Sequence, residues 1–427
     1  MKLRNRLIAL VCLILFLGIG AVLLMSSAKR KPFAVILFVA DNINPSALTS
    51  ARIFSGGGDA RLQLEDLPNT ALCRNAANDY SVPGGASAST AIAGGKRVNR
   101  ESLCMDPRGG KLRSLLELAS DQGRSTGLLT TGEIISPTSA AYFAKTLNAN
   151  DIGELRQQFC THAPFDFVAG GGGDSFTKKE DSTDQKSRST SSPLSPELKQ
   201  LSDKNVAIMH SMNELEKQPF WKRTPVLALL SPGPLSPSSF GEGNPDSPSL
   251  SDLVRVAIRN LQANRRGYLL VVDDPMIAAA GYANDAESMF ARILSLDQAI
   301  GTARRYAGEN ALIVLVGREN IGGLELNGYP LLRDKGVAIL ALNNQGYPSL
   351  CWSTGPGFST EKRNPSSTHP EKANASPGIL SQPSAYNLPT AVGTAGDVLG
   401  IGIGQGSEKL HGFLDLTEIH TVIKDAL

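Results

Sequence analysis

Seven short, almost wholly apolar runs constrain the fold of this chain more than any other feature. They are rich in Val, Ile and Leu without polar alternation, which is typical of strands buried on both faces of a parallel sheet. The runs cover residues 33–40, 125–131, 224–230, 268–272, 311–316, 337–342 and 398–404. Helical patterns lie between several of them. We therefore predict an α/β fold with a doubly wound, mostly parallel sheet and helices on both faces.

Two of the intervening helices are marked clearly. Leu112, Leu115, Leu116 and Ala119 share one helical face, and Gly123 is a natural stop. The second predicted helix begins after a cap at Ser249, with Asp252 three residues later, and ends before Gly267; its apolar face is formed by Leu250, Leu253, Val254, Ala257 and Leu261. Each helix follows or precedes an apolar run, as a layered α/β fold requires.

Composition excludes several classes of protein. The 427 residues are 41% hydrophobic, which excludes disorder for the bulk of the chain. Lys and Arg number 42 against 40 Asp and Glu, a formal charge of +2, so no strong positive field favours nucleic acid as a partner. Five cysteines without a CxxC pair encode neither a zinc ribbon nor a thioredoxin-like site.

Residues 1–31 have the pattern of an export or anchoring segment. Lys2, Arg4 and Arg6 precede an uncharged apolar run over 7–25, and three basic residues follow at 29–31. A membrane anchor and a cleaved signal peptide both remain open, because the run is long enough to cross a bilayer and is followed by small residues. If the N-terminus stays inside the cell, both interpretations place the body of the chain outside the cytoplasm, in the periplasm or at the cell surface, either membrane-anchored or secreted.

The remaining residues, 32–427, are interpreted as a single domain. Three stretches rich in Ser and Pro interrupt the strand and helix rhythm, near 178–198, 231–248 and 353–383, and we predict surface insertions there. Four cysteines of the body, Cys73, Cys104, Cys160 and Cys351, have the option of pairing in an oxidising compartment, and the sequence does not select the pairs.

Several segments, in order along the body, resemble the alkaline phosphatase family. They are the strand end at 40–44 (ADNIN), VPGGASASTAIAGGKRV at 82–98, LRSLLELASDQGRSTGLLTT at 112–131, VAGGGG at 168–173, the helix and strand at 248–273, ALIVLVGRENIGGL at 311–324 and 393–415. The resemblance implies an alkaline-phosphatase-like fold. It also implies a chemistry in which two zinc ions and a serine nucleophile transfer a phosphoryl group, with magnesium close by.

Most residues required for that chemistry are replaced in this chain. The Asp and Ser of the family's nucleophile motif correspond to Gly84 and Gly85, and glycine has no oxygen to attack phosphorus. Ser87 and Ser89 are displaced from the nucleophile position by two and four residues, and phosphoryl transfer depends on accurate positioning. We therefore expect no catalytic nucleophile, and interpret these serines as small residues packed at the start of a helix.

The zinc ligands implied by the resemblance are largely missing as well. The first zinc site corresponds to Ala278, Tyr282 and Gly393, none of which is a ligand of the family type. In the second site, Asp41 matches the strand-end aspartate, but Arg318 and Glu319 replace an Asp-His pair. A guanidinium in place of a carboxylate repels a divalent cation, so no zinc is expected.

Two interpretations of the remaining residues stay open. Asp41, Thr138 (with Ser136 beside it) and Asp273 correspond to the family's magnesium site, and their oxygens could form a residual site for magnesium. Alternatively, Arg318 stands beside Asp41 and supplies permanently the positive charge that zinc supplies in the enzymes. We favour the second interpretation, because a buried aspartate without a cation is costly.

The leading functional prediction is a pseudoenzyme: an exported or membrane-tethered, alkaline-phosphatase-like protein that works as a non-catalytic binding or partner protein. Homodimer formation and pairing with an active relative are both open, and the N-terminal segment is the predicted contact with a membrane. The alternative is a divergent metal-dependent phosphomonoesterase, an alkaline phosphatase-type hydrolase that uses the residual magnesium site. The sequence does not identify a ligand.

Overall fold

The computed structural model describes residues 33–162, 165–176, 196–219, 221, 223–235, 248–327, 339–340, 348–356 and 382–427, together with 4, 6, 10–18 and 20 near the N-terminus. Most of the predicted N-terminal segment and most of the three predicted insertions lie outside these residues. Within the described residues, no helix is both long and apolar enough to cross a membrane.

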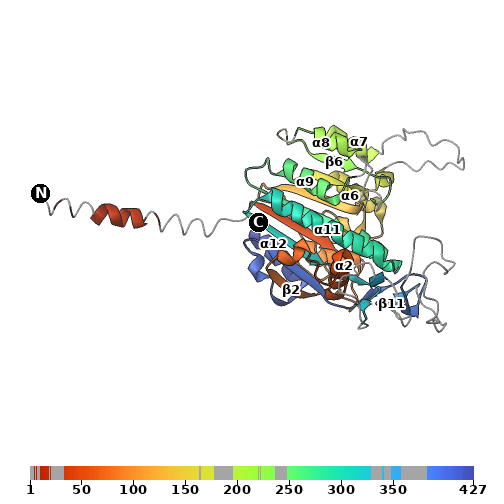
Figure 1. Cartoon of the computed structure of the whole chain (residues 1–427). Coiled ribbons are helices and arrows are strands. Elements are labelled where there is room, and N and C mark those ends of the chain that lie inside the picture. Colours follow the sequence, from red (N-terminus) through yellow and green to blue (C-terminus); the bar gives the residue numbers. More distant parts are fainter. Residues whose placement is uncertain are drawn as a thin grey trace.

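A ten-stranded sheet forms the centre of the body (Figure 1). In spatial order its strands are β15 (Gly412–Asp415), β2 (Asn69–Arg74), β14 (Val398–Ile403), β8 (Ala311–Gly317), β1 (Ala34–Ala40), β7 (Tyr268–Asp274), β3 (Ser125–Glu133), β4 (Phe167–Gly171), β6 (Val226–Leu229) and β5 (Ala207–Met209). Only β14 runs antiparallel to its two neighbours. The predicted doubly wound, mostly parallel sheet is therefore confirmed.

Smaller strands flank this sheet near the site described below. A three-stranded sheet contains β10 (Leu324–Leu326), β11 (Leu350–Gly355) and β12 (Ser384–Asn387). β9 (Asn320–Ile321) pairs with β13 (Gly393–Thr394). In the predicted run over 337–342, the two described residues, Ile339 and Leu340, lie in a short 3-10 turn, so they are not in a strand. The third predicted insertion begins inside β11, because this strand extends to Gly355.

Helices cover both faces of the large sheet. On one face lie α2 (Pro45–Gly56), α9 (Leu250–Leu261), α10 (Met276–Tyr282) and α11 (Ala286–Ala307). On the other lie α3 (Gly85–Gly94), α4 (Leu115–Asp121), α5 (Pro137–Ala140), α6 (Ile152–His162), α7 (Pro196–Asp203) and α12 (Leu416–Ala426). α8 (Met212–Lys217) belongs to the first of these faces, where it buries Met212 and Leu215. Short 3-10 turns occur at Gln63–Asp66, Gly173–Phe176 and Ser407–Lys409.

The two predicted helices are present, with small differences at their ends. Ser249 caps α9 by accepting a hydrogen bond from the Asp252 amide at 3.0 Å, as its pattern predicts. α4 begins later than its apolar face suggests, because Ser114 and Glu117 form a capping box there. Leu112 therefore precedes the helix, although its side chain is still buried.

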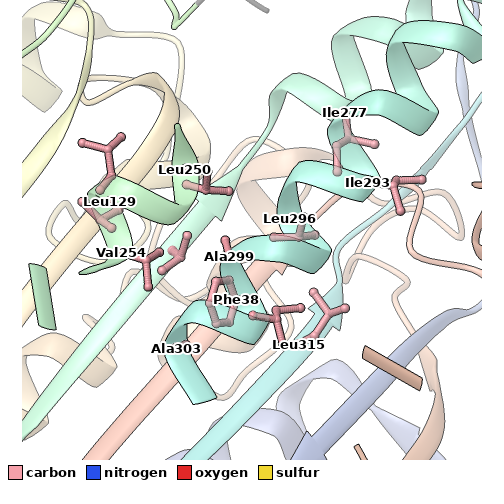
Figure 2. Close-up of a cluster of buried hydrophobic side chains, with 14 of the residues drawn as sticks. Phe38, Leu129, Leu250, Val254, Ile277, Ile293, Leu296, Ala299, Ala303 and Leu315 are labelled. Atoms are coloured by element: carbon pink, nitrogen blue, oxygen red, sulfur yellow. The ribbon is translucent and has the colours of Figure 1, made fainter. Parts of the chain in front are cut away.

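Alternation along the central strands divides the hydrophobic core into two layers. In Figure 2, Phe38 of β1 and Leu315 of β8 lie near Leu296, Ala299 and Ala303 of α11. The intervening residues of the same strands point to the other layer, among helices α3, α4 and α12. Each central strand is buried on both faces, which explains why its sequence shows no polar alternation.

No disulfide bond joins the five cysteines in the part of the chain that the structure describes. Cys73, Cys104 and Cys160 are buried, and Cys351 is partly buried. Cys104 Sγ donates to the Ala141 carbonyl at 3.0 Å, which is a local packing contact. The option of disulfide pairing in the body is therefore not realised in this structure.

Candidate functional site

Three charged side chains lie together at the carboxyl ends of three adjacent strands. Asp41 directly follows β1, Asp273 lies near the end of β7, and Arg318 directly follows β8. β1 is the central strand of the three, and its residue Val39 is in register with Asp273 and with Val316. Alternate residues of a strand lie on the same face of a sheet. Asp41, Asp273 and Arg318 therefore lie on the face of the sheet that packs against α3, α4 and α12.

The Arg318 guanidinium binds both aspartates. Its Nε and one terminal nitrogen donate to the two oxygens of Asp41 at 2.9 and 2.5 Å. The other terminal nitrogen donates to Asp273 Oδ1 at 2.7 Å and to Ser89 Oγ at 3.2 Å. Arg318 and Asp273 are 0% exposed and Asp41 is 1% exposed. Such a bidentate, charge-assisted pair is strong and restricts the geometry of all three groups.

Burial and charge act in opposite directions on these groups. Burial raises the pKa of Asp41, and the adjoining Arg318 charge opposes that rise. Burial alone lowers the pKa of Arg318, but the Asp41 and Asp273 carboxylates raise it well above its ordinary value. The guanidinium is therefore a permanent positive charge at the centre of the cluster.

Hydroxyl groups of α5 donate hydrogen bonds to the second carboxylate oxygen of Asp273. Thr138 and Ser139 donate to Asp273 Oδ2 at 2.8 and 3.1 Å. Ser136 Oγ lies 3.3 Å from Thr138 Oγ1. The structure therefore brings together Asp41, Thr138 and Asp273, the residues predicted as a residual magnesium site, and it places Arg318 between the two carboxylates.

Three contacts of this cluster were not predicted from the sequence. Ser89 of α3 accepts from Arg318, Ser139 donates to Asp273, and the side-chain amide of Asn75 donates to the Arg318 carbonyl at 3.2 Å. Small polar residues are common at helix starts and strand ends, so no local pattern distinguishes these three. Ser87 is used locally instead, since its hydroxyl hydrogen-bonds both backbone groups of Gly84.

Glu319 lies beside the predicted nucleophile position. A Cβ added at Gly85 would lie 3.1 Å from Thr138 Cγ2 and 3.3 Å from Glu319 Oε1, so Glu319 and Thr138 fill the space into which a side chain at position 85 would extend. Burial and the nearby Asp41 charge raise the pKa of Glu319 to about 8. Much of this carboxyl is therefore protonated near neutral pH.

The comparisons with known proteins agree on one family. The model of the family described as "Alkaline phosphatase" matches residues 33–427. The tissue-nonspecific alkaline phosphatase of Gallus gallus is 25% identical over 378 residues, 76% of this chain and 71% of the relative. Alkaline phosphatase 4 of Bacillus subtilis is 26% identical over 318 residues, 70% of this chain and 65% of the relative.

The chain belongs to the alkaline phosphatase family. Its fold agrees with this assignment: the solved alkaline phosphatase of the Antarctic bacterium TAB5 superposes with a TM-score of 0.70 at 21% identity, covering 93% of this chain and 98% of that one. A solved variant of that bacterial protein carries magnesium in a site named M3. The predicted alkaline-phosphatase-like fold is thus confirmed.

The positions matched to the family's first zinc site carry no side chain that binds zinc. Ala278 and Tyr282 lie on α10, and Gly393 lies in β13. Within the part of the chain that the structure describes, no three His, Cys, Asp or Glu side chains converge in a metal-binding arrangement. In the second site, Arg318 already holds both oxygens of Asp41. These residues do not suit a zinc pair of the family type.

Asp274 is a further buried carboxyl, on the opposite face of the sheet from Asp273. Its Oδ1 accepts from Thr131 at 2.5 Å, and it is 2% exposed. Burial raises its pKa from 3.8 to about 6, although Thr131 and the charge of Arg292 oppose the rise. This carboxyl is separate from the Arg318 cluster and has a structural role in the α11 layer.

The pKa of Asp274 predicts a specific pH dependence of stability. Because the folded chain binds this proton more tightly, the contribution is fully present below pH 3.8 and is lost as pH rises through about 6. We expect the unfolding free energy of the wild type to fall, relative to Asp274→Asn, by roughly 2–3 kcal/mol over that window and to remain level above it. Urea unfolding across pH measures the difference. The exposed Asp203→Asn is the control and should follow the wild type across pH. If the wild type changed relative to Asp203→Asn as much as it does relative to Asp274→Asn, the assignment to Asp274 would be contradicted.

Proposed function

We propose that this chain is a non-catalytic, alkaline-phosphatase-like binding or partner protein. One observation carries the proposal: the Arg318 guanidinium occupies both oxygens of Asp41 and one oxygen of Asp273, where the family's metal ions would require those oxygens. A fixed cation at this place supplies charge but provides no Lewis acid and no open coordination position.

The nucleophile position gives a second line of support. Gly85 offers no oxygen, and Ser89 Oγ, which is 0% exposed, is bound to Arg318. Ser87 is held by the backbone of Gly84. Neither serine is therefore free to attack a phosphate ester without a rearrangement of the helix start.

Arg318 is itself poorly suited to bind a phosphate. A guanidinium has five N–H donors. The Arg318 guanidinium donates four hydrogen bonds to Asp41, Asp273 and Ser89. The alternative, a metal-dependent phosphomonoesterase acting through magnesium at Asp41, Thr138 and Asp273, requires this guanidinium to leave the cluster. The observed contacts favour the non-catalytic interpretation.

The proposal extends to location and partners. The basic and apolar pattern of residues 1–31 supports export or membrane tethering, so the protein would work outside the cytoplasm. A homodimer and a complex with an active relative are the two partner arrangements proposed for it.

Turnover of an activated aryl phosphate tests the proposal. The purified chain is assayed with zinc and magnesium added, beside an active alkaline phosphatase as the positive control. We expect no metal-dependent hydrolysis above background, because nucleophile and metal ligands are both replaced. Metal-dependent turnover that disappears in Asp41→Ala would establish the alternative.

A further inference from the structure

The edge of the large sheet at which its parallel strands begin lies at the opposite end from the Arg318 cluster. We name it the amino edge and define it as Phe33 and the described residues of the connections that enter β3 to β8. The chain enters the body at Phe33. Its carbonyl accepts hydrogen bonds from the Tyr268 amide at 3.0 Å and the Arg124 guanidinium at 3.3 Å, and its amide donates to the Asn310 carbonyl at 3.0 Å. The N-terminal segment is therefore joined to the body at this edge.

Exposed charge on the amino edge is mainly positive. Four exposed basic side chains lie in the described parts of these connections: Lys204, Arg223, Arg265 and Arg266. Glu309 is the exposed acidic residue there, and Asp166 is half-buried and accepts a hydrogen bond from the Thr126 amide at 2.9 Å. The last turns of the adjoining helices carry both signs, at Arg305, Lys424, Asp203 and Asp425. Since the whole chain has a formal charge of only +2, the positive excess is a local property of this edge.

Two of these arginines lie close to the start of β3. A Cβ added at Gly123, just before this strand, would contact a terminal nitrogen of Arg266. Ser125, the first residue of β3, lines a small hollow together with Arg223. The arginines thus lie across neighbouring strand starts, where their positive charges act together on a surface that approaches the edge.

An exposed tryptophan accompanies this positive charge. Trp221, in the connection that enters β6, is 69% exposed. Tyr306, in the last turn of α11, is 51% exposed. Rings of these two types are enriched at the headgroup level of membranes. The second tryptophan of the chain, Trp352 of β11, is 1% exposed and packs against Gly322 beyond the carboxyl end of β8.

Chain length keeps the amino edge close to the N-terminal apolar run. That run ends at residue 25 and Phe33 already belongs to the body, so residues 26–32 join the two. A stretch of this length spans at most about 25 Å, even when fully extended. When the run is held in a bilayer, the amino edge is therefore the face of the body nearest to that bilayer.

We propose that the amino edge docks on an anionic phospholipid bilayer, with its arginines at the lipid phosphates and Trp221 at the headgroup level. This inference rests on the proposed membrane tethering by residues 1–31 and adds an orientation to it: the Arg318 end of the sheet points away from the membrane. A bilayer suits the edge better than a soluble polyanion does, because the basic residues and the exposed rings lie at the edge where the tether joins the body. The Arg318 end is then the one that faces a soluble partner.

Tryptophan quenching by brominated lipids tests the proposal. The full chain is mixed with vesicles of phosphatidylcholine alone, or of equal parts phosphatidylcholine and phosphatidylglycerol, both with brominated acyl chains. The difference between the wild type and Trp221→Phe isolates the signal of Trp221, since Trp352 is buried. We expect quenching of Trp221 by the anionic vesicles only. It should be relieved in 1 M salt, where the screening length is about 3 Å.

Removal of two arginines should weaken the docking. In Arg265→Gln/Arg266→Gln, the ratio of docked to undocked chain should fall about tenfold or more, because each cation near an anionic surface contributes roughly fivefold. Arg74→Gln/Arg100→Gln is the matched control and should behave like the wild type. Both control arginines are exposed; Arg74 ends β2, and Arg100 lies against Gly84, before α3. Thermal unfolding of each variant shows whether a loss of docking reflects a loss of fold.

Three outcomes would overturn the inference: no quenching of Trp221 on anionic vesicles, equal quenching on neutral vesicles, or equal quenching in Arg265→Gln/Arg266→Gln. A dimer that forms without vesicles and disappears in this double variant would assign the edge to a second copy, and would contradict the inference as well. Co-sedimentation with neutral vesicles tests the tether separately. A chain that co-sediments with them but shows no quenching of Trp221 on anionic vesicles contradicts this inference alone, whereas a chain that binds neither kind of vesicle also contradicts the proposed tethering.

Discussion

Arg318→Ala is expected to lower the free energy of unfolding by about 3–5 kcal/mol, because it leaves two buried carboxylates without their cation. Asp41 and Asp273 are 1% and 0% exposed, so water cannot replace the lost hydrogen bonds without opening the sheet end. Urea unfolding followed by circular dichroism measures the change. Arg318→Lys should recover part of the loss, since an ammonium restores the charge but not the bidentate geometry.

The matched control for this variant is a surface arginine in an ion pair. Arg61 and Asp66 lie 2.6 Å apart, with side chains 70% and 44% exposed. Arg61→Ala should therefore cost about 0–1 kcal/mol. A loss in Arg318→Ala no greater than in this control would mean that the buried cluster does not depend on the guanidinium. If Arg318→Ala cannot be purified folded, the difference between Arg318→Lys and the wild type still measures the contribution of the bidentate contact.

Asp41→Ala should also destabilise the fold by about 3–5 kcal/mol, and its effect should not add to that of Arg318→Ala. Removing Asp41 leaves the guanidinium with Asp273 and Ser89 only. Once Arg318 is absent, the loss of Asp41 removes a repelling charge next to Asp273. We expect the double variant to be more stable than the sum of the single effects predicts, by about 1–3 kcal/mol.

A second double-mutant cycle is the control for this measurement. A double-mutant cycle between Asp41 and Arg61 should show additive effects, because Arg61 pairs with Asp66 and Asp41 with Arg318. Additive effects for Asp41 and Arg318 as well would mean that the two side chains act independently. The bidentate contact would then make no contribution to the free energy of unfolding.

Much of this fold is readable from the sequence because the central strands are buried on both faces. The runs that became β1, β3, β6, β7, β8 and β14 have no polar alternation, and the sheet buries both of their surfaces. Alternation within a strand also explains how Asp41, Asp273 and Arg318 reach the same side. β5 and β12 were not predicted, because they are short and lie near sheet edges. Their partly exposed residues give no clear hydrophobic pattern.

The candidate site was only partly predictable. The strand-end position of Asp41 and the replacement of a matched ligand by Arg318 directed attention to these two residues, and the ion pair between them is present. The partners Ser89, Ser139 and Asn75 come from α3, α5 and the loop after β2, and only the folded chain brings those segments together. Glu319 was noted as a ligand replacement, but its position beside Gly85 depends on tertiary packing.

Metal analysis of the purified full chain, prepared without chelators, tests most directly whether a guanidinium has taken the place of the metals. With Arg318 holding both oxygens of Asp41, we predict no stoichiometric zinc in the wild type, before or after incubation with excess zinc. Two tightly bound zinc ions per chain, lost in Asp41→Ala, would contradict the account.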